Sequence, residues 1–176
     1  MGLTSRLLEE RIVLLGSAVD DTSCNLVAAQ LLYLEHLDPE RDIHLYINSG
    51  GGDAQSKYAI IDTMNFIRPD VSTACIGRAA SAAALIFACG ENGKRFALPN
   101  WRFMIHQPQG TIGGTASDIE IAARTAPATK QRSFEILAAA TGQPLDRIET
   151  ACDRDLWLTA DKALDPGLVA EILQER

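Results

Sequence analysis

A single serine, Ser81, stands among small residues where an apolar strand pattern gives way to a helical one. The run Ser72–Ile76 predicts a strand, and Ala82–Cys89 predicts the first turns of a helix. At a helix N-terminus, backbone N–H groups and the positive end of the dipole face the hydroxyl. Ala79 and Ala83 hold the two glycine places of the Gly-x-Ser-x-Gly nucleophile elbow. Ser81 is therefore a candidate nucleophile, and a simple N-cap is the structural alternative.

A glycine-rich loop, Asn48-Ser49-Gly50-Gly51-Gly52, follows the apolar run Ile43–Ile47 directly. Consecutive glycines at the C-terminal end of a strand let backbone N–H groups approach a ligand closely. Such a loop can supply a donor to an oxyanion hole, and a flexible turn is the structural alternative. A phosphate cradle is disfavoured, because Asp53 follows the glycines where that motif needs Lys and Ser or Thr.

His106 ends the apolar run that starts at Phe103, and a Gln-Pro pair after it keeps the chain extended as it leaves the sheet. The chain has 3 histidines, and the other two neighbour no other reactive residue. His106 is thus the candidate general base, with a purely structural histidine at a strand end as the alternative.

An acidic segment, Asp153-Arg154-Asp155, precedes the apolar run Leu156–Leu158. A serine–histidine pair needs a carboxylate that orients the imidazole and stabilises the imidazolium. The chain contains 13 aspartates, and spacing alone does not select one of them. Ion pairing with Arg154 is the simpler interpretation of this cluster.

Composition excludes several classes of function. The net charge is −7, with 16 basic and 23 acidic residues and no basic cluster, so nucleic acid is not an expected partner. The N-terminal residues lack the apolar core of a signal peptide, and the longest apolar run is too short to cross a membrane, so a cytoplasmic protein is expected. Buried, reduced thiols are expected for the four cysteines, which form no Cys-x-x-Cys pair: Cys24, Cys75, Cys89 and Cys152.

The first half of the chain alternates strand and helix patterns, which predicts a layered α/β domain with parallel strands. Further strands are expected at Ile12–Leu15, Arg95–Leu98 and Phe103–His106, and helices at Thr22–Leu37 and Ala54–Ile67.

The second half contains a glycine-rich stretch, Gly110–Gly114, and a helical pattern over Ser117–Thr141 that Gly142 ends. Pro127 lies inside this pattern and is expected to break or kink it, so that the halves form separate helices. No repeat or linker marks a boundary, which predicts a single domain over residues 1–176.

Many ordered motifs match one known family. They are Ser5-Arg6-Leu7-Leu8, Arg11-Ile12, Tyr46-Ile47-Asn48-Ser49, Asp62-Thr63-Met64, Phe66-Ile67, Pro69-Asp70-Val71-Ser72-Thr73, Gly77-Arg78-Ala79-Ala80-Ser81, Gly93-Lys94-Arg95-Phe96, Leu98-Pro99-Asn100, Met104-Ile105-His106-Gln107-Pro108, Asp118-Ile119-Glu120-Ile121, Thr141-Gly142-Gln143 and Asp153-Arg154-Asp155. On these motifs, almost the whole chain closely resembles the proteolytic subunit of the Clp protease, the caseinolytic ClpP-type serine peptidases.

The resemblance implies a role for each matching residue. Ser81 matches the nucleophile, His106 the general base and Asp155 the orienting aspartate, while Gly52 and Ala82 match the two backbone donors of the oxyanion hole. Peptide binding is implied for Gly51 and for the edge strand with Thr111, Ile112, Gly113 and Gly114, and contacts between rings for Asp153 and Arg154.

The resemblance also implies an architecture and partners. The expected fold is the layered β-β-α spiral of the ClpP and crotonase proteins, with a head over about 1–107 and 143–176 and a handle over about 108–142. Subunits, identical or paralogous, would form two stacked heptameric rings. A separate hexameric AAA+ unfoldase would use ATP and feed unfolded chains, so this chain is expected to hold no cofactor or metal.

Four features depart from the family pattern. Gly50 stands where the family has proline, which is expected to loosen the loop that carries Gly52, and Ala82-Ala83 replace Met-Gly, which is expected to alter the pocket beside the nucleophile. Pro127 interrupts the handle, and little of the pore-lining N-terminal segment is expected. Two alternatives follow: a mainly structural ring subunit beside an active paralogue, and an acyl-CoA enzyme of the related crotonase fold.

Overall fold

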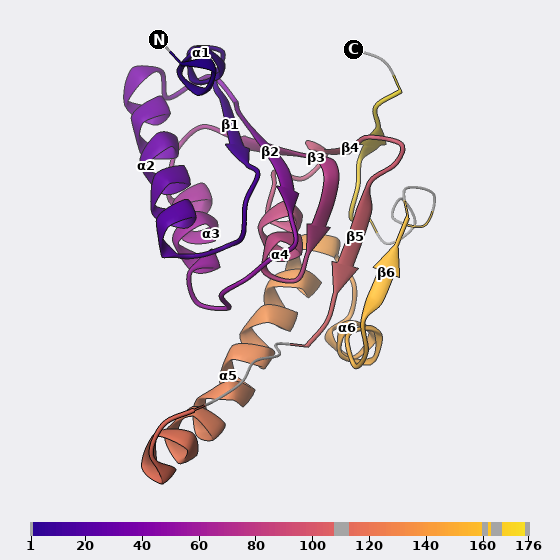
Figure 1. The fold of residues 1–176 in the computed structure, drawn as a ribbon. Helices are drawn as coiled ribbons and strands as arrows, with labels where there is room; N and C mark the ends of the chain where they lie inside the picture. The colour runs from indigo at the N-terminus through magenta and orange to yellow at the C-terminus, as the bar shows by residue number, and fades with distance from the viewer. Residues whose placement is uncertain (1, 108–112, 160–161, 163–166, 175–176) are drawn as a thin grey trace.

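The computed structural model describes residues 2–107, 113–159, 162 and 167–174 of the chain. Strands and helices alternate through the first half, and one long helix dominates the second half (Figure 1). The mixed α/β class predicted from the apolar runs is confirmed.

The sheet is built around the long strand β3 (Val71–Ala80). On one side of it lie β2 (Ile43–Ser49) and then β1 (Ile12–Leu15). On the other side, β3 pairs first with β4 (Arg95–Ala97) and further along with β5 (Arg102–Ile105). All four pairings are parallel, as the alternating pattern predicts. The residues that directly follow β3 and β5 therefore meet at one edge of the sheet.

Two short strands complete the sheet. β6 (Leu156–Leu158) pairs antiparallel with β5, so the apolar run after Asp155 is a strand. β7 (Glu171–Ile172) pairs parallel with β4 and was not expected from the sequence, because only two residues take part.

Helices α2 (Asp21–Leu37), α3 (Lys57–Phe66) and α4 (Ala82–Ala88) follow β1, β2 and β3 and pack beside the sheet (Figure 1). The side chain of Asp20 accepts a hydrogen bond from Ser23 N at 2.8 Å, and its own N–H donates to Ser23 Oγ at 3.0 Å. This reciprocal cap fixes the start of α2. Two shorter helices are α1 (Leu3–Glu9) and α6 (Leu145–Ala151).

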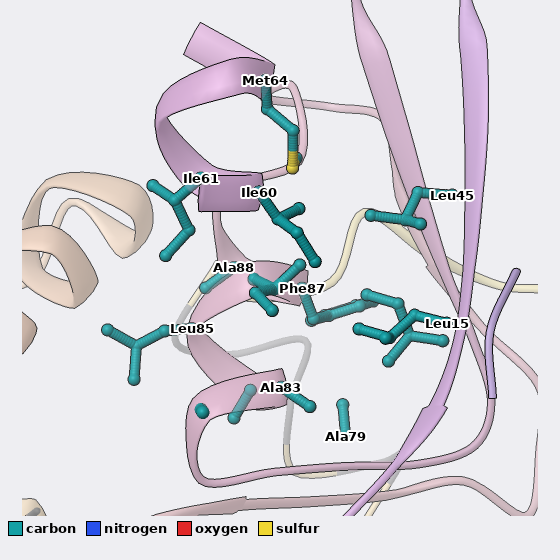
Figure 2. Close-up of a cluster of buried hydrophobic side chains, with 14 of the residues drawn as sticks. Leu15, Leu45, Ile60, Ile61, Met64, Ala79, Ala83, Leu85, Phe87 and Ala88 are labelled. Atoms are coloured by element: carbon teal, nitrogen blue, oxygen red, sulfur yellow. The ribbon is translucent and has the colours of Figure 1, made fainter. Parts of the chain in front are cut away.

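The core lies between the sheet and these helices, and α4 is buried along its whole length (Figure 2). Small side chains such as Ala79 on β3 and Ala83 on α4 are fully buried, so helix and strand approach closely. Phe87 packs against Trp101 and Phe103, with ring centroids 5.4 and 6.1 Å apart. Burying each such side chain stabilises the fold by about 1.5–3 kcal/mol, which makes α4 a rigid support for the residue before it.

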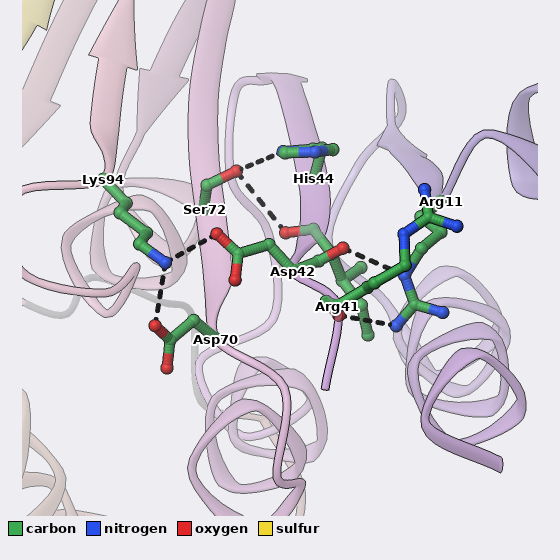
Figure 3. Close-up of polar contacts among 8 residues, drawn as sticks. Arg11, Arg41, Asp42, His44, Asp70, Ser72 and Lys94 are labelled. Carbon is green, nitrogen blue, oxygen red and sulfur yellow. Dashed lines mark hydrogen bonds and ion pairs between the residues drawn. The ribbon is translucent and has the colours of Figure 1, made fainter. Parts of the chain in front are cut away.

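A polar network joins the starts of three neighbouring strands, at the edge of the sheet away from Ser81 (Figure 3). Lys94, just before β4, lies 2.6 Å from Asp42 and 2.8 Å from Asp70, which precede β2 and β3. Both hydrogen bonds raise the pKa of Lys94. The buried guanidinium of Arg11 donates to the carbonyls of Leu34, Asp38, Arg41 and Asp42 and thus ties α2 to the start of β2.

Helix α5 (Ala116–Thr141) runs without interruption through Pro127, so the expectation of two separate helices was wrong. Pro127 removes one N–H donor, but the carbonyl that this donor would meet belongs to the exposed Ala123, where water can replace it. A capping box of Thr115 and Asp118 fixes the first turn, and Gly142 ends the helix with φ of 69°. α5 projects away from the sheet (Figure 1).

The four cysteines are unpaired, as predicted. Within the described residues, no helix is long and apolar enough to cross a membrane.

Candidate active site

Ser81 occupies a sharp turn between β3 and α4. Its φ and ψ are 54° and −121°, a conformation that costs a residue with a side chain on the order of 1–3 kcal/mol. The turn is held because Ser81 N donates to Met104 O at 2.8 Å and because α4 is buried behind it. Ser81 does not cap the helix with its side chain. The hydroxyl is therefore free for another partner.

That partner is His106, the first residue after β5. Its Nε2 lies 2.8 Å from Ser81 Oγ, and its Nδ1 lies 3.2 Å from Asp155 Oδ1. Nδ1 facing a carboxylate carries the ring proton in the neutral imidazole, which leaves Nε2 as the acceptor for the serine hydroxyl. The imidazole side chain is 13% exposed and the carboxylate 51%. Serine hydrolases use the same succession of contacts, from the serine hydroxyl to the histidine and from the histidine to the aspartate.

The pairing of β5 and β6 explains why Asp155 reaches the imidazole. In this antiparallel pair Ile105 lies opposite Leu156, so the residue after Ile105 faces the residue before Leu156. These residues are His106 and Asp155. A long-range pairing therefore selects one aspartate where spacing could not.

The remaining histidines lie elsewhere. His44 Nδ1 is 2.7 Å from Ser72 Oγ at the polar edge shown in Figure 3, and His36 lies in the last turn of α2. Cysteine does not compete as the nucleophile here, since burial raises the pKa of the nearby Cys152 thiol to about 11.

The glycine loop packs directly on the Ser81 turn. Gly51 and Gly52 have φ of 88° and 155°, which glycine adopts without strain. A Cβ at Gly51 would lie only 2.8 Å from Ser81 Cβ and 3.1 Å from Ala82 N, so a side chain cannot fit there. Ser49 Oγ accepts from Gly51 N at 3.1 Å and braces the loop. The loop, the nucleophile turn and the start of α4 are thus in contact.

The expected binding and ring-contact residues have mixed outcomes. Thr111 and Ile112 lie outside the described residues, while Gly113 and Gly114 precede the cap of α5. Arg154 Nε and Asp153 lie 3.8 Å apart with both side chains largely exposed, which is the simple ion pair anticipated as an alternative. The role of Asp153 and Arg154 between rings stays a prediction, and so does peptide binding by the glycine-rich segment.

Three contacts at the site had no signal in the sequence. Gln107, next to His106, donates from its backbone to Cys152 O at 2.9 Å and from its side chain to Asp153 O at 3.2 Å. Lys130 of α5 donates to Gln107 Oε1 at 3.0 Å. Each joins segments far apart in the chain, and local patterns do not report such contacts.

The described residues contain no group of three or more acidic, histidine or cysteine side chains that could hold a metal ion. Comparison with protein-family models matches residues 1–176 to a family described as Clp protease.

Proposed function

Because this chain belongs to the Clp protease family, which it matches over its whole length, we propose that it is a serine endopeptidase subunit that hydrolyses peptide bonds of unfolded proteins. The family is one of ClpP-type serine peptidases. The observation that carries the proposal is the contact of Ser81 Oγ with His106 Nε2 at 2.8 Å, together with Asp155 at 3.2 Å from His106 Nδ1.

In acylation, Ser81 Oγ bonds to the carbonyl carbon of the peptide while His106 Nε2 takes the hydroxyl proton. The C=O electron pair moves to the oxygen, and the N–H groups of Gly52 and Ala82 stabilise this oxyanion. As the oxyanion collapses, the C–N bond breaks and His106 gives its proton to the leaving amine. Asp155 stabilises the imidazolium and is not itself protonated.

In deacylation, a water molecule gives a proton to His106 and attacks the acyl carbon, and the proton then returns to Ser81 as the acid leaves. General acid–base transfer contributes about 10²–10⁴-fold to such reactions. Each oxyanion donor contributes roughly 3–4 kcal/mol to transition-state binding.

Unfolded chains would bind in extended form, with Gly51 and the residues Thr111, Ile112, Gly113 and Gly114 as their proposed contacts. Main-chain hydrogen bonds to an extended peptide tolerate many side chains, which suits a protease for unfolded proteins. The glycine-rich composition of the stretch supports this part of the proposal.

The enzyme would act as two stacked seven-membered rings of this subunit or of paralogues, in the cytoplasm, with Asp153 and Arg154 in contacts between rings. The projection of α5 away from the sheet and the exposure of Ile119 and Ile121 near its start support a handle that joins the rings (Figure 1). A separate ATP-dependent unfoldase would deliver substrates, and this chain itself would need no cofactor.

Peptide hydrolysis by the wild type and by Ser81→Ala, with native mass measured in the same samples, tests the proposal. Loss of activity with the assembly retained is the expected result. Labelling by a serine-directed phosphonate, alone and in a mixed complex with a paralogue, separates an active subunit from a structural one. Without labelling of Ser81 in either sample, the catalytic assignment fails. If the protein binds acyl-CoA, and if Ser81→Ala keeps the full activity of the wild type, the results would instead favour an acyl-CoA enzyme.

A further inference from the structure

Gln107 connects the residue beside it, His106, with two other parts of the molecule. Its backbone N–H and its side-chain amide both donate to the loop before β6, at Cys152 O and Asp153 O. The other polar atom of its side chain, Oε1, accepts a hydrogen bond from Lys130 on α5. One residue thus links β5, the loop of residues 152–155 and the long helix.

Lys130 determines which way the amide of Gln107 points. An ammonium group has donors only, so it must face the amide oxygen. The amide NH₂ is then directed to the carbonyl of Asp153, which can only accept. Lys130 is itself held near the ring of Phe134, at 5.5 Å from the centroid.

The loop that Gln107 holds carries Asp155. The Asp155 carboxylate is half-exposed, and among the described residues its recorded hydrogen bond is the one to His106. Its place therefore depends on the backbone around it. The pairing of Ile105 with Leu156 holds this backbone on one side, and the two donors of Gln107 hold it on the other.

We propose that Gln107 and Lys130 are positioning residues that keep Asp155 within reach of His106 Nδ1. This inference rests on the proposed peptidase function. Lys130 orients the Gln107 amide, the amide and the backbone N–H fix residues 152 and 153, and the fixed loop presents the carboxylate to the imidazole. A contact that merely anchored α5 would affect stability alone.

The test compares Lys130→Met with Lys130→Arg and with Arg132→Met. Arg132 is two residues further along α5, on another side of the helix, and pairs with Glu135 at 3.8 Å, so its loss changes the charge without touching Gln107. Peptide hydrolysis gives kcat and KM, and hydrogen exchange reports on the amide of Gln107 and on residues 152–158. Native mass confirms the assembly of every sample.

We expect Lys130→Met to lower kcat by about 10–10²-fold with KM within twofold of wild type, because a small displacement of a catalytic group has effects of this size. Exchange at Gln107 and over residues 152–158 should rise. Lys130→Arg should recover most of the activity, and Arg132→Met should match wild type in both measurements.

Gln107→Glu separates the two roles of the side chain. It keeps an acceptor for Lys130, so α5 stays anchored, but it loses the donor to Asp153 O. We expect the same loss of kcat as for Lys130→Met, with unfolding temperature retained. Wild-type kcat and exchange in Lys130→Met and Gln107→Glu would overturn the inference. If the wild type shows no Ser81-dependent hydrolysis, the proposed function fails, and unchanged exchange over residues 152–158 would still overturn the positioning role.

Discussion

Gly52 lies against Val19 so closely that no side chain fits between them. A Cβ at residue 52 would be 2.2 Å from the carbonyl oxygen of Val19. Two backbone hydrogen bonds flank this contact. Val19 N donates to Gly51 O at 3.0 Å, and Asp53 N donates to Val19 O at 2.8 Å. The N–H of Gly52 takes part in neither bond. Val19 thus steadies the loop that contains Gly50, Gly51 and Gly52.

We expect Gly52→Ala to lower kcat about 10²–10³-fold, because the loop must move away from Val19 and carry the N–H of Gly52, the proposed oxyanion donor, with it. Stability should also fall, by about 1–3 kcal/mol. Gly93→Ala is the matched control: its φ is 79°, but a Cβ there meets nothing within 4 Å. The control should lose stability and keep its kcat. Wild-type kcat in Gly52→Ala would contradict the role of this loop.

The strained backbone of Ser81 predicts an order of stabilities among inactive variants. Ser81→Gly and Ser81→Ala both lose the hydroxyl and its bond to His106, so that loss cancels in the comparison. Glycine relieves the strain at φ of 54°, which alanine retains. We expect the glycine variant to be about 1 kcal/mol more stable by urea denaturation. Equal stabilities would show that the strain does not exceed the cost of the extra unfolded-state entropy of glycine, about 0.4–1 kcal/mol.

Pro127 leaves one carbonyl of α5 without its helical donor. Pro127→Ala restores that hydrogen bond and should stabilise the protein by up to about 3 kcal/mol, since proline is that unfavourable inside a helix. Thermal unfolding of assemblies matched in native mass measures the change. A variant that melts at or below the wild-type temperature would mean that contacts of α5, such as that of Thr129 with Gln55, require the proline.

Local patterns in the sequence predict the features that depend on neighbouring residues, such as strand bounds and the residues at strand ends. Periodicity predicts the strand Ile12–Leu15 at its observed bounds, and Ser81 and His106 are candidates because each follows an apolar run. Residue types and spacing do not select Asp155, which the family resemblance alone indicates. Its place beside His106 follows from the antiparallel pairing of β5 with β6, a contact between segments about fifty residues apart that periodicity does not encode.

The wrong expectation at Pro127 has a similar cause. Proline chemistry argued for a break at Pro127, but the capping box at one end of α5 and the buried Phe134 and Leu137 near the other hold the helix together. The contact of the Gly51–Gly52 loop with Val19 is likewise absent from the sequence analysis, because its hydrogen bonds join backbone atoms and do not depend on the Val19 side chain. Such a contact leaves no trace in residue types.

Lys57, at the start of α3, is buried although it carries an ammonium group. Its side chain is 2% exposed, donates to the carbonyl of Ala54 and lies 4.2 Å from the centroid of the Tyr58 ring. Burial lowers the pKa of Lys57 from 10.5 to about 8, and the nearby Asp53 opposes this only in part. The folded protein therefore releases this proton at a lower pH than the unfolded chain does.

The sign of the pH dependence follows. Below pH 8 both states hold the proton, and the folded state bears the full cost of a buried charge. Between pH 8 and 10.5 only the unfolded chain is protonated at this residue, so the free energy of unfolding rises with pH, by at most about 3 kcal/mol.

We expect Lys57→Met to be more stable than wild type at pH 7 and to lose this advantage progressively up to pH 10. Lys162→Met, which removes a charge from an exposed side chain, should follow wild type throughout. Urea denaturation at fixed protein concentration measures all three, and parallel curves for wild type and Lys57→Met from pH 7 to 10 would contradict the lowered pKa.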